Sequence, residues 1–336
     1  MNTGSVFQII ILLLILMACS KKTLIESTLR NDAFVTVGNL SSGRYGHASV
    51  ASGNEIYIIG GMQLSTRLLT RNIEIFNVED YSIKIIPAII TPRRYLVAVT
   101  LDSGIYIIGG AKYAPTIPIY KTTISQTTGI TEKYDLRTEK LTAVPAMPTP
   151  RMYMGVVAYK DKIHVIGRSQ FKSFIDKSFI SNPSAYFRFL SAMEIYDTKS
   201  NTWIEGPSMP TARQCAAVLY RDKIYVIGRY NGYPLPNFEI FDIDKNKWET
   251  KKDVPLAMSA YSYVASHGCI YFFGDYNELN RVLVYDIEKD KWLNVESNFK
   301  GRRHNTSVCM NNDIYVVGGN ISPFTDLSII QKYRIM

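Results

Sequence analysis

The chain has 336 residues, of which 46% are hydrophobic and 20% charged, with 23 tyrosines and 14 phenylalanines. This composition excludes an intrinsically disordered chain, because the apolar and aromatic side chains suffice for a large packed core. The formal net charge of +9 comes from lysines and arginines that are scattered along the chain. Scattered charge indicates a solvated basic surface and argues against a nucleic-acid site, so we expect no nucleic-acid partner.

An apolar run over residues 6–18 lies near the start of the chain and is followed by a cysteine, giving the letters LMAC. The run is shorter than the ~20 residues that a membrane-spanning helix needs, and it suits the hydrophobic core of a signal peptide. The letters LMAC resemble the bacterial lipobox, whose cysteine receives a diacylglyceride before cleavage. We therefore predict a lipoprotein signal peptide over residues 1–18 and lipidation of Cys19. An ordinary cleaved signal and an uncleaved anchor are the alternatives, because the first eight residues contain no Lys or Arg.

The polar residues 19–33 are expected to form a tether between the lipid and a folded domain. Ser20 stands directly after the cysteine, at the position where enteric lipoproteins held at the inner membrane carry Asp. By that resemblance we expect a lipid-anchored protein of the cell envelope, at the outer membrane or on the periplasmic face.

Three further cysteines, Cys215, Cys269 and Cys309, lie among apolar residues of predicted strands. An odd number of cysteines cannot all pair within one chain. We therefore expect free thiols that behave as small buried hydrophobic groups, and no disulfide framework.

A sixfold repeat occupies the rest of the chain. The string IYIIGG at 56–61 recurs as IYIIGG, IHVIGR, IYVIGR, IYFFGD and IYVVGG at 105–110, 163–168, 224–229, 270–275 and 314–319. The first glycines of successive copies are 44 to 61 residues apart. Spacing of this size with variable insertions is typical of a β-propeller, in which each repeat forms one four-stranded sheet.

Each copy has the pattern of an antiparallel meander. A short apolar strand and a tight polar turn precede the strand that ends in glycine, as in GVVAYKDK at 155–162. A third strand with alternating character follows, such as MEIYD at 193–197. Three copies carry a tryptophan seven residues after the aromatic residue of this third strand, namely Trp203, Trp248 and Trp292. In the second copy Leu141 holds that place, and in the first copy Tyr81 follows Phe76 by five residues.

These glycines, tyrosines and tryptophans resemble the kelch-repeat family over about residues 34–335, and the resemblance implies an all-β, six-bladed β-propeller over residues 34–336. The sixth copy ends after its third strand, whereas the strand-like FVTVGNL at 34–40 precedes the first hairpin. We therefore predict that residues 34–40 complete the last blade, which closes the ring and removes its exposed edges. The alternative is an open ring in which residues 31–40 are only a linker.

Arginines are predicted to gather on one face of the ring. In a four-stranded meander, the loop that leads into the first strand and the loop between the second and third strands lie on the same face. The hairpin starts carry Arg44, Arg93, Arg94, Arg151, Arg213, Arg302, Arg303 and His304, and the glycines are followed by Arg168, Arg229, Tyr230, Asp275 and Asn320. Two long insertions over 111–129 and 168–191, both containing aromatic residues, belong to the same face.

The ligand-binding candidates on this face are Arg44, Arg94, Arg151, Arg168, Arg213, Arg229, Tyr230 and Arg303. Guanidinium groups suit the recognition of carboxylates and phosphates. The resemblance to kelch domains implies that protein or peptide partners dock here, commonly through such arginines. The alternative for each arginine is a structural role, in which it hydrogen-bonds neighbouring loop carbonyls and never contacts a ligand.

The sequence nominates no catalytic residue, and we expect no metal and no cofactor. A copper site, such as that of the kelch-type copper oxidases, needs paired imidazoles. Only His47 and His304 are expected near the arginine-bearing face. His164 replaces a tyrosine of the repeat and is expected in the core, and His267 lies in a turn on the opposite face.

The sequence therefore predicts a non-catalytic binding module on the bacterial cell envelope. It would act as a monomer and take a protein, an acidic peptide or a glycan as its ligand. A periplasmic sugar-active enzyme similar to the sialic-acid mutarotases, which are also kelch propellers, is the alternative. Such an enzyme needs only an acid or base near the channel, so the lack of a catalytic motif does not exclude it.

Overall fold

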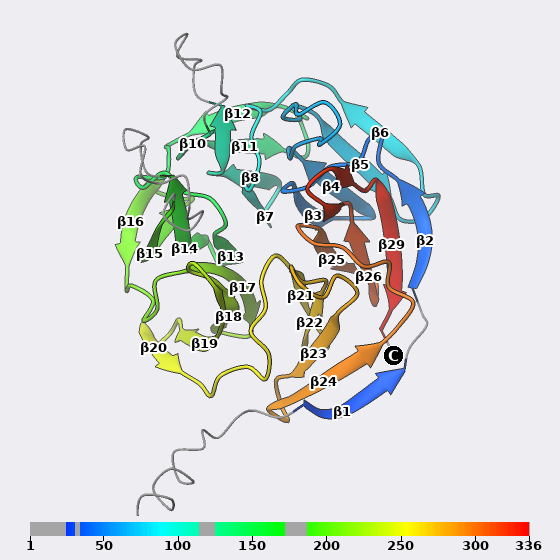
Figure 1. Ribbon diagram of the computed structural model, residues 1–336. Coiled ribbons are helices and arrows are strands. Elements are labelled where there is room, and N and C mark those ends of the chain that lie inside the picture. Colours follow the sequence, from blue (N-terminus) through cyan, green and yellow to red (C-terminus); the bar gives the residue numbers. More distant parts are fainter. Residues whose placement is uncertain (1–24, 31–33, 114–124, 172–186, 336) are drawn as a thin grey trace, which may run out of the picture.

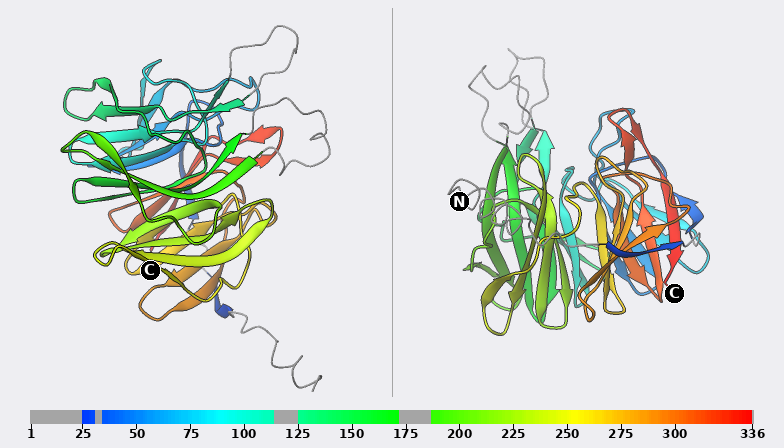
Figure 2. Two further views of the ribbon diagram at one scale, coloured as in Figure 1. Left: turned by 90° about the vertical axis from the view of Figure 1, so that its left-hand side faces the viewer. Right: turned by 60° about the horizontal axis from the view of Figure 1, so that its bottom comes forward.

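The computed structural model describes residues 25–30, 34–113, 125–171 and 187–335. In these ranges the regular elements are strands, and six sheets, five of four strands and one of five, surround a central axis as the blades of a propeller (Figure 1). The side views in Figure 2 show that the strands run from one face of the ring to the other. None of the described elements is a helix long and apolar enough to cross a membrane. The expected all-β, six-bladed propeller is thus confirmed.

The first three blades follow the chain order, each from the axis outward. Blade I contains β3 (Ala48–Ser52), β4 (Glu55–Ile59), β5 (Ile73–Asn77) and β6 (Ile83–Ile86). Blade II contains β7 (Val97–Leu101), β8 (Gly104–Ile108), β11 (Thr131–Asp135) and β12 (Leu141–Val144), with a short hairpin of β9 (Ala111–Tyr113) and β10 (Ser125–Thr127). Blade III contains β13 (Gly155–Tyr159), β14 (Lys162–Phe171), β15 (Phe187–Asp197) and β16 (Thr202–Gly206).

The other three blades complete the ring. Blade IV contains β17 (Gln214–Tyr220), β18 (Lys223–Tyr230), β19 (Pro234–Asp242) and β20 (Lys247–Thr250). Blade V contains β21 (Ser262–Ser266), β22 (Cys269–Phe273), β23 (Val282–Asp286) and β24 (Lys291–Glu296), with β1 (Ile25–Arg30) at its outer edge. Blade VI contains β25 (Thr306–Met310), β26 (Asp313–Val317), β29 (Ile329–Arg334) and β2 (Phe34–Asn39), with a hairpin of β27 (Asn320–Ser322) and β28 (Thr325–Asp326).

The hydrophobic core lies between the blades. Each of the six interfaces holds one cluster of buried apolar side chains, drawn from the two blades that meet there. Two tryptophans also bridge an interface through a hydrogen bond. The indole N–H groups of Trp203 and Trp248 donate to the carbonyls of Pro145 and Pro207 at 2.7 and 2.8 Å. A single repeat could not bury these faces alone, so each blade depends on its neighbours.

The spacing of seven residues corresponds to a pairing between the third and fourth strands, since Tyr196 lies opposite Trp203 and the other two tryptophans follow the same register. Blade I keeps this register without a tryptophan. Its pair is Phe76 with Ile83, and Tyr81 lies in the preceding turn with a φ of 62°. The turn closes through a hydrogen bond from Asn77 N to Ser82 O, which leaves no strand position for Tyr81.

Strand β2 closes the ring, as the sequence predicted. It pairs antiparallel with β29, and this places Phe34 opposite Tyr333, in the position that tryptophan takes in blades III to V. The two rings lie 4.7 Å apart between centroids, and Phe34 also meets Phe273 of blade V at 5.9 Å. The N-terminal part of the domain therefore supplies the partner that the last repeat lacks.

Part of the expected tether forms a strand. Residues Ile25–Arg30 pair in parallel with β24 and add a fifth strand to blade V (Figure 1). The outer strand of a blade offers unpaired backbone groups, which explains why a flanking segment adds to it. The predicted signal peptide over 1–18 and the tether residues 19–24 and 31–33 lie outside the described residues.

Phe34→Ala should lower the free energy of unfolding by about 3–5 kcal/mol, because it removes a buried aromatic ring that is 4% exposed. Val35→Ala is the matched control in the same strand, since Val35 is 59% exposed and its truncation should cost less than about 0.5 kcal/mol. Chemical denaturation measures both values. Equal losses for the two variants would contradict closure of the ring through β2.

Candidate functional site

The loops that lead into the first strands and the loops between the second and third strands lie on one face of the ring. We call this face the mouth. The second-to-third-strand loops that are described throughout span 60–72, 274–281 and 318–328, together with the tip at 231–233. The hairpin β27–β28, red in Figure 2, belongs to the mouth. The opposite face consists of the short turns that join the first to the second strand and the third to the fourth.

Four arginines at the hairpin starts are buried in ion pairs within their own blades. Each has 0% exposure and pairs with a glutamate on the third strand, as Arg44–Glu74, Arg93–Glu132, Arg151–Glu194 and Arg213–Glu239. The N···O distances of the last three are 2.6, 3.0 and 2.5 Å. In blade VI, Arg302 instead donates to the amide oxygen of Gln331 at 2.5 Å. Burial lowers the pKa of Arg302 to about 9.

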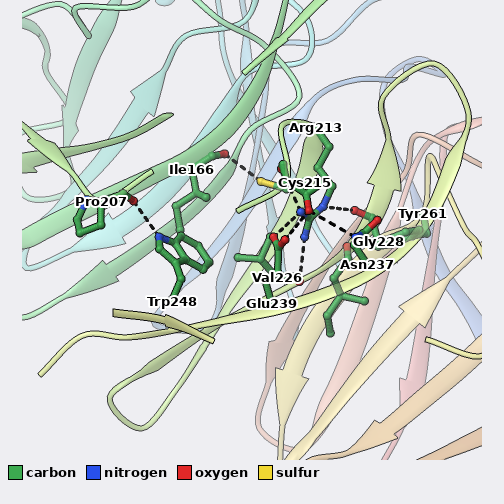
Figure 3. Close-up of polar contacts among 12 residues, drawn as sticks. Ile166, Pro207, Arg213, Cys215, Val226, Gly228, Asn237, Glu239, Trp248 and Tyr261 are labelled. Carbon is green, nitrogen blue, oxygen red and sulfur yellow. Dashed lines mark hydrogen bonds and ion pairs between the residues drawn. The ribbon is translucent and has the colours of Figure 1, made fainter. Parts of the chain in front are cut away.

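Arg213 shows what these arginines do (Figure 3). Its Nη1 donates to Glu239, and its Nε and Nη2 donate to the carbonyls of Gly228 and Val226 at 2.9 and 3.3 Å. One guanidinium therefore joins the start of the hairpin to the second and third strands of the blade. This is the structural role given above as the alternative.

The burial of these side chains corrects the expected site. Arg44, Arg151 and Arg213 were expected to contact a ligand, but a side chain without exposed surface cannot do so. They therefore leave the candidate set. The reason is that each of these guanidinium groups pairs with a carboxylate inside its own blade, which the arginine positions alone did not indicate.

A signal for these pairs is present in the repeats themselves. The third strands of blades I to IV read IEIF, TEKY, MEIY and FEIF, with the glutamate at a fixed place. Blade V has Met258 at the arginine position and Leu283 at the glutamate position. In blades I to V the arginine and the glutamate are kept together and lost together, and in blade VI the glutamine Gln331 takes the place of the glutamate as the partner of Arg302. This pattern indicates a direct contact.

Arg213→Ala should lower the free energy of unfolding by about 3–5 kcal/mol, because it leaves the carboxylate of Glu239 buried without its partner. The double variant Arg213→Met with Glu239→Leu copies the residues of blade V and should recover most of that loss. Arg303→Ala, on the mouth, is the control and should cost less than about 1 kcal/mol. Denaturant unfolding measures all three. A double variant as unstable as Arg213→Ala would contradict the pairing.

Backbone hydrogen bonds link neighbouring blades around the channel at the mouth. Tyr95 N donates to Gly46 O, Tyr153 N to Tyr95 O, Cys215 N to Tyr153 O, His304 N to Ala260 O and Gly46 N to His304 O, at 2.6 to 3.3 Å. Between blades IV and V the link is a side chain. The guanidinium of Arg229 donates to Cys215 O at 3.4 Å and to Tyr261 O at 3.2 Å.

Arg229 has a strained backbone. Its φ is 97°, and the glycines at the same repeat position, Gly61, Gly110 and Gly319, have φ between 93° and 103°. A bulky residue in this region costs free energy, and such strain clusters at functional sites. The Arg229 guanidinium also lies 5.5 Å from the ring centroid of Tyr261 and lines the central cavity. Arg229 therefore stays in the candidate set.

The central cavity opens between the first strands and has a volume of about 210 Å³. Its lining includes Tyr95 and Tyr153, whose rings stack with centroids 4.0 Å apart, and the imidazole of His304. His304 Nδ1 hydrogen-bonds Asn320 Oδ1 at 2.9 Å, and burial lowers the pKa of His304 to about 4. The imidazole is therefore neutral at physiological pH.

Three other candidates, Arg94, Tyr230 and Arg303, lie at the mouth and do not line the cavity. Arg94 donates to Tyr45 Oη at 2.7 Å, and Arg303 stacks on Tyr276 with 3.9 Å between the guanidinium carbon and the ring centroid. Tyr230 meets Phe189 edge to face at 6.0 Å. Arg168 lies in β14, and its side chain is outside the described residues. The structure thus brings Arg94, Arg229 and Arg303 to the mouth.

The sequence analysis missed a set of exposed apolar side chains on the mouth. Phe324 is 83% exposed and Tyr233 is 63% exposed, and Leu68 and Tyr276 are also exposed. All four lie in loops between second and third strands. Large apolar residues at turns that glycine, asparagine and aspartate normally occupy were the available signal.

The remaining histidines and cysteines have structural surroundings. His47 and His164 are buried, as expected for His164, and His267 lies in the turn between β21 and β22. The three cysteines of the described ranges are free thiols; Cys215 is buried and the other two are half-buried. In the described ranges no group of three His, Cys, Asp or Glu side chains is placed to hold a metal ion.

Burial of His164 should make stability depend on pH. Burial lowers the pKa of His164 to about 4, below the value of about 6.5 that histidine has in the unfolded chain. The unfolded chain therefore takes up the proton first, and stability is lost as the pH falls from about 6.5 to 4, by about 3 kcal/mol for this group. His164→Tyr, which restores the repeat residue, should weaken this dependence. Denaturation between pH 4 and pH 8 tests it, and identical profiles for the two proteins would contradict the assignment.

Comparison with known proteins agrees with the fold. A family model described as "FKB95, Kelch-repeats domain" matches residues 122–318, and a Kelch motif model matches residues 43–81. The chain belongs to the kelch-repeat family. Kelch propellers are typically protein-binding modules.

Several curated proteins are similar in sequence. Kelch-like protein 7 of Mus musculus is 29% identical over 286 residues, covering 70% of this chain and 45% of that protein. Kelch-like protein 23 of Homo sapiens is 28% identical over 148 residues, covering 40% and 26%. An F-box/kelch-repeat protein of Arabidopsis thaliana is 23% identical over 238 residues, covering 66% and 58%. The chain spans less than two thirds of the length of each of these relatives.

Proposed function

We propose that this chain is a non-catalytic binding module of the bacterial cell envelope, which acts as a monomer and captures an acidic protein or peptide at its mouth. The observation that carries the proposal is the gathering of exposed apolar side chains and arginines on one face. Phe324, Tyr233 and Tyr276 stand on the loops of the mouth, and Arg303 stacks on Tyr276.

The composition of the mouth supports protein binding. Tyrosine, phenylalanine and arginine are the side chains that are enriched in protein interfaces, and tyrosine and arginine in particular carry much of the binding free energy. Exposed apolar residues scattered singly over a surface need no explanation, but a group on one face marks an interaction site. The stacking of Arg303 on Tyr276 also orders the guanidinium in advance, which reduces the entropy lost on binding.

The charge of the mouth favours an acidic partner. Arg94 and Arg303 lie at the mouth and Arg229 lines the cavity. Guanidinium groups suit carboxylates in a bidentate geometry. The three side chains are positioned by contacts with Tyr95, Tyr261 and Tyr276. An acidic segment with an apolar neighbour would match both the arginines and the exposed rings.

The placement on the cell envelope rests on the N-terminal sequence. The apolar run over 6–18 and the letters LMAC support export and lipidation of Cys19. The relatives described above carry kelch repeats in eukaryotes and bear only on the propeller.

A sugar-active enzyme finds less support. Such an enzyme needs a proton donor or acceptor beside its substrate. His304 lines the central cavity, but its pKa of about 4 makes it a weak base at neutral pH. Binding without catalysis is therefore the function that we propose.

Capture from envelope extracts with a chemical crosslinker tests the mouth. The mouth variant carries Tyr276→Ala, Arg303→Ala and Phe324→Ala, and it should lose the partner that the unaltered protein captures. The control variant carries Val35→Ala, Ile85→Ala and Ile204→Ala, which are exposed on outer strands, and it should keep that partner. Both variants should retain the melting temperature, since none of the six side chains is buried. Equal capture by the two variants would contradict the proposal.

A further inference from the structure

We infer that the ring is anchored with its mouth directed away from the membrane and its opposite face toward the lipid. The inference rests on the proposed lipidation of Cys19. It concerns the place where the N-terminal segment joins the ring, which the described strands β1 and β24 determine.

The direction of β1 shows where the chain reaches the ring. Strand β1 runs parallel to β24, with Ile25 opposite Trp292 and Arg30 opposite Glu296. Strand β24 begins directly after the turn at 287–290, which belongs to the opposite face, and it ends at the loop that leads to the mouth. The N-terminal end of β1 therefore lies at the opposite face. Figure 1 shows the two strands side by side at the outer edge of blade V.

The short spacing between the lipid and β1 limits the orientation. Cys19 and Ile25 are six residues apart, so their Cα atoms can be separated by at most about 20 Å. The paired length of β1 along β24 is itself about 16 Å. To bring the mouth onto a bilayer, the segment would have to run back along the whole height of blade V. Only about 4 Å would then remain, which is too short to reach past the projecting loops of the mouth.

The mouth carries side chains of the kind that membrane-binding surfaces use. Exposed rings such as Phe324 and Tyr233, with arginines beside them, could also contact a membrane interface. The attachment at the opposite end of blade V excludes that arrangement for the anchored protein. The mouth is thereby left free for a partner in the aqueous phase.

The opposite face has the charge balance of a surface that neither inserts into lipid nor binds it strongly. Its turns carry basic and acidic side chains that pair with one another, such as Lys199–Asp161 at 2.6 Å and Arg221–Glu288 at 2.8 Å. Mutually neutralised charges give little attraction to anionic lipid. The acyl chains on Cys19, and not this face, would then hold the protein at the bilayer.

A quenching experiment on the lipidated full chain tests the orientation. Cys269→Ser and Cys309→Ser remove the half-buried thiols, and one fluorophore is placed at Asp244→Cys on the opposite face or at Tyr233→Cys on the mouth of the same blade. Vesicles of phosphatidylcholine and phosphatidylglycerol carry a spin label on the lipid headgroups. The probe at position 244 should be quenched severalfold more strongly than the probe at position 233. Equal quenching, or stronger quenching at 233, would overturn the inference.

A second variant separates the orientation from the proposed lipidation. Cys19→Ala should abolish incorporation of labelled palmitate and release the protein from the vesicles. Unchanged labelling or unchanged vesicle binding in that variant would overturn the lipidation, and the inference with it. Normal lipidation with reversed quenching would overturn the orientation alone.

Discussion

The buried pair between an arginine at the start of a hairpin and a glutamate on the third strand is the interaction on which the mouth depends. In blades I to IV it joins the three strands nearest the channel at the point where they leave the sheet. Removing one partner of such a pair is costly, because a charge then remains buried alone. Blade V, with Met258 and Leu283, shows that a blade can form without it. The pair therefore holds the loops of the mouth in place, and the sheet can form without it.

Burial of these arginines divides the basic residues of the mouth into two groups. Those at the first position of the hairpin start hold the scaffold. Of those at other positions, Arg94 and Arg303 lie at the mouth in contact with tyrosines, and Arg229 lines the cavity. Arg229 belongs to both groups, because its side chain links blades IV and V and also lines the cavity. Its backbone φ is strained. Rigid blades that present arginines and aromatic rings on short loops are well suited to bind a partner without ordering themselves first.

The fold was predictable because the repeat spacing, the strand pattern and the turn residues all indicate the same architecture. The glycines give the period of the repeat, and the missing strand of the sixth copy assigns residues 34–40 to the last blade, where Phe34 then lies opposite Tyr333. The site was predictable only in part. An arginine at a hairpin start looks the same in the sequence whether its side chain turns inward or outward. The distinguishing signal is the glutamate, or in blade VI the glutamine, at the matching position of the third strand. The exposed rings of the mouth and the pairing of β1 with β24 were not anticipated, because each depends on a spatial neighbour that lies far away in the sequence.

Chemical modification of arginines in the folded protein tests the division between scaffold and mouth most directly. After treatment with phenylglyoxal, peptide mass spectrometry gives a modification rate for each arginine. We expect Arg303 and Arg94 to react in the native protein, and Arg44, Arg93, Arg151, Arg213 and Arg302 to react only after unfolding. Modification of Arg151 or Arg213 at the rate of Arg303 under native conditions would contradict the account.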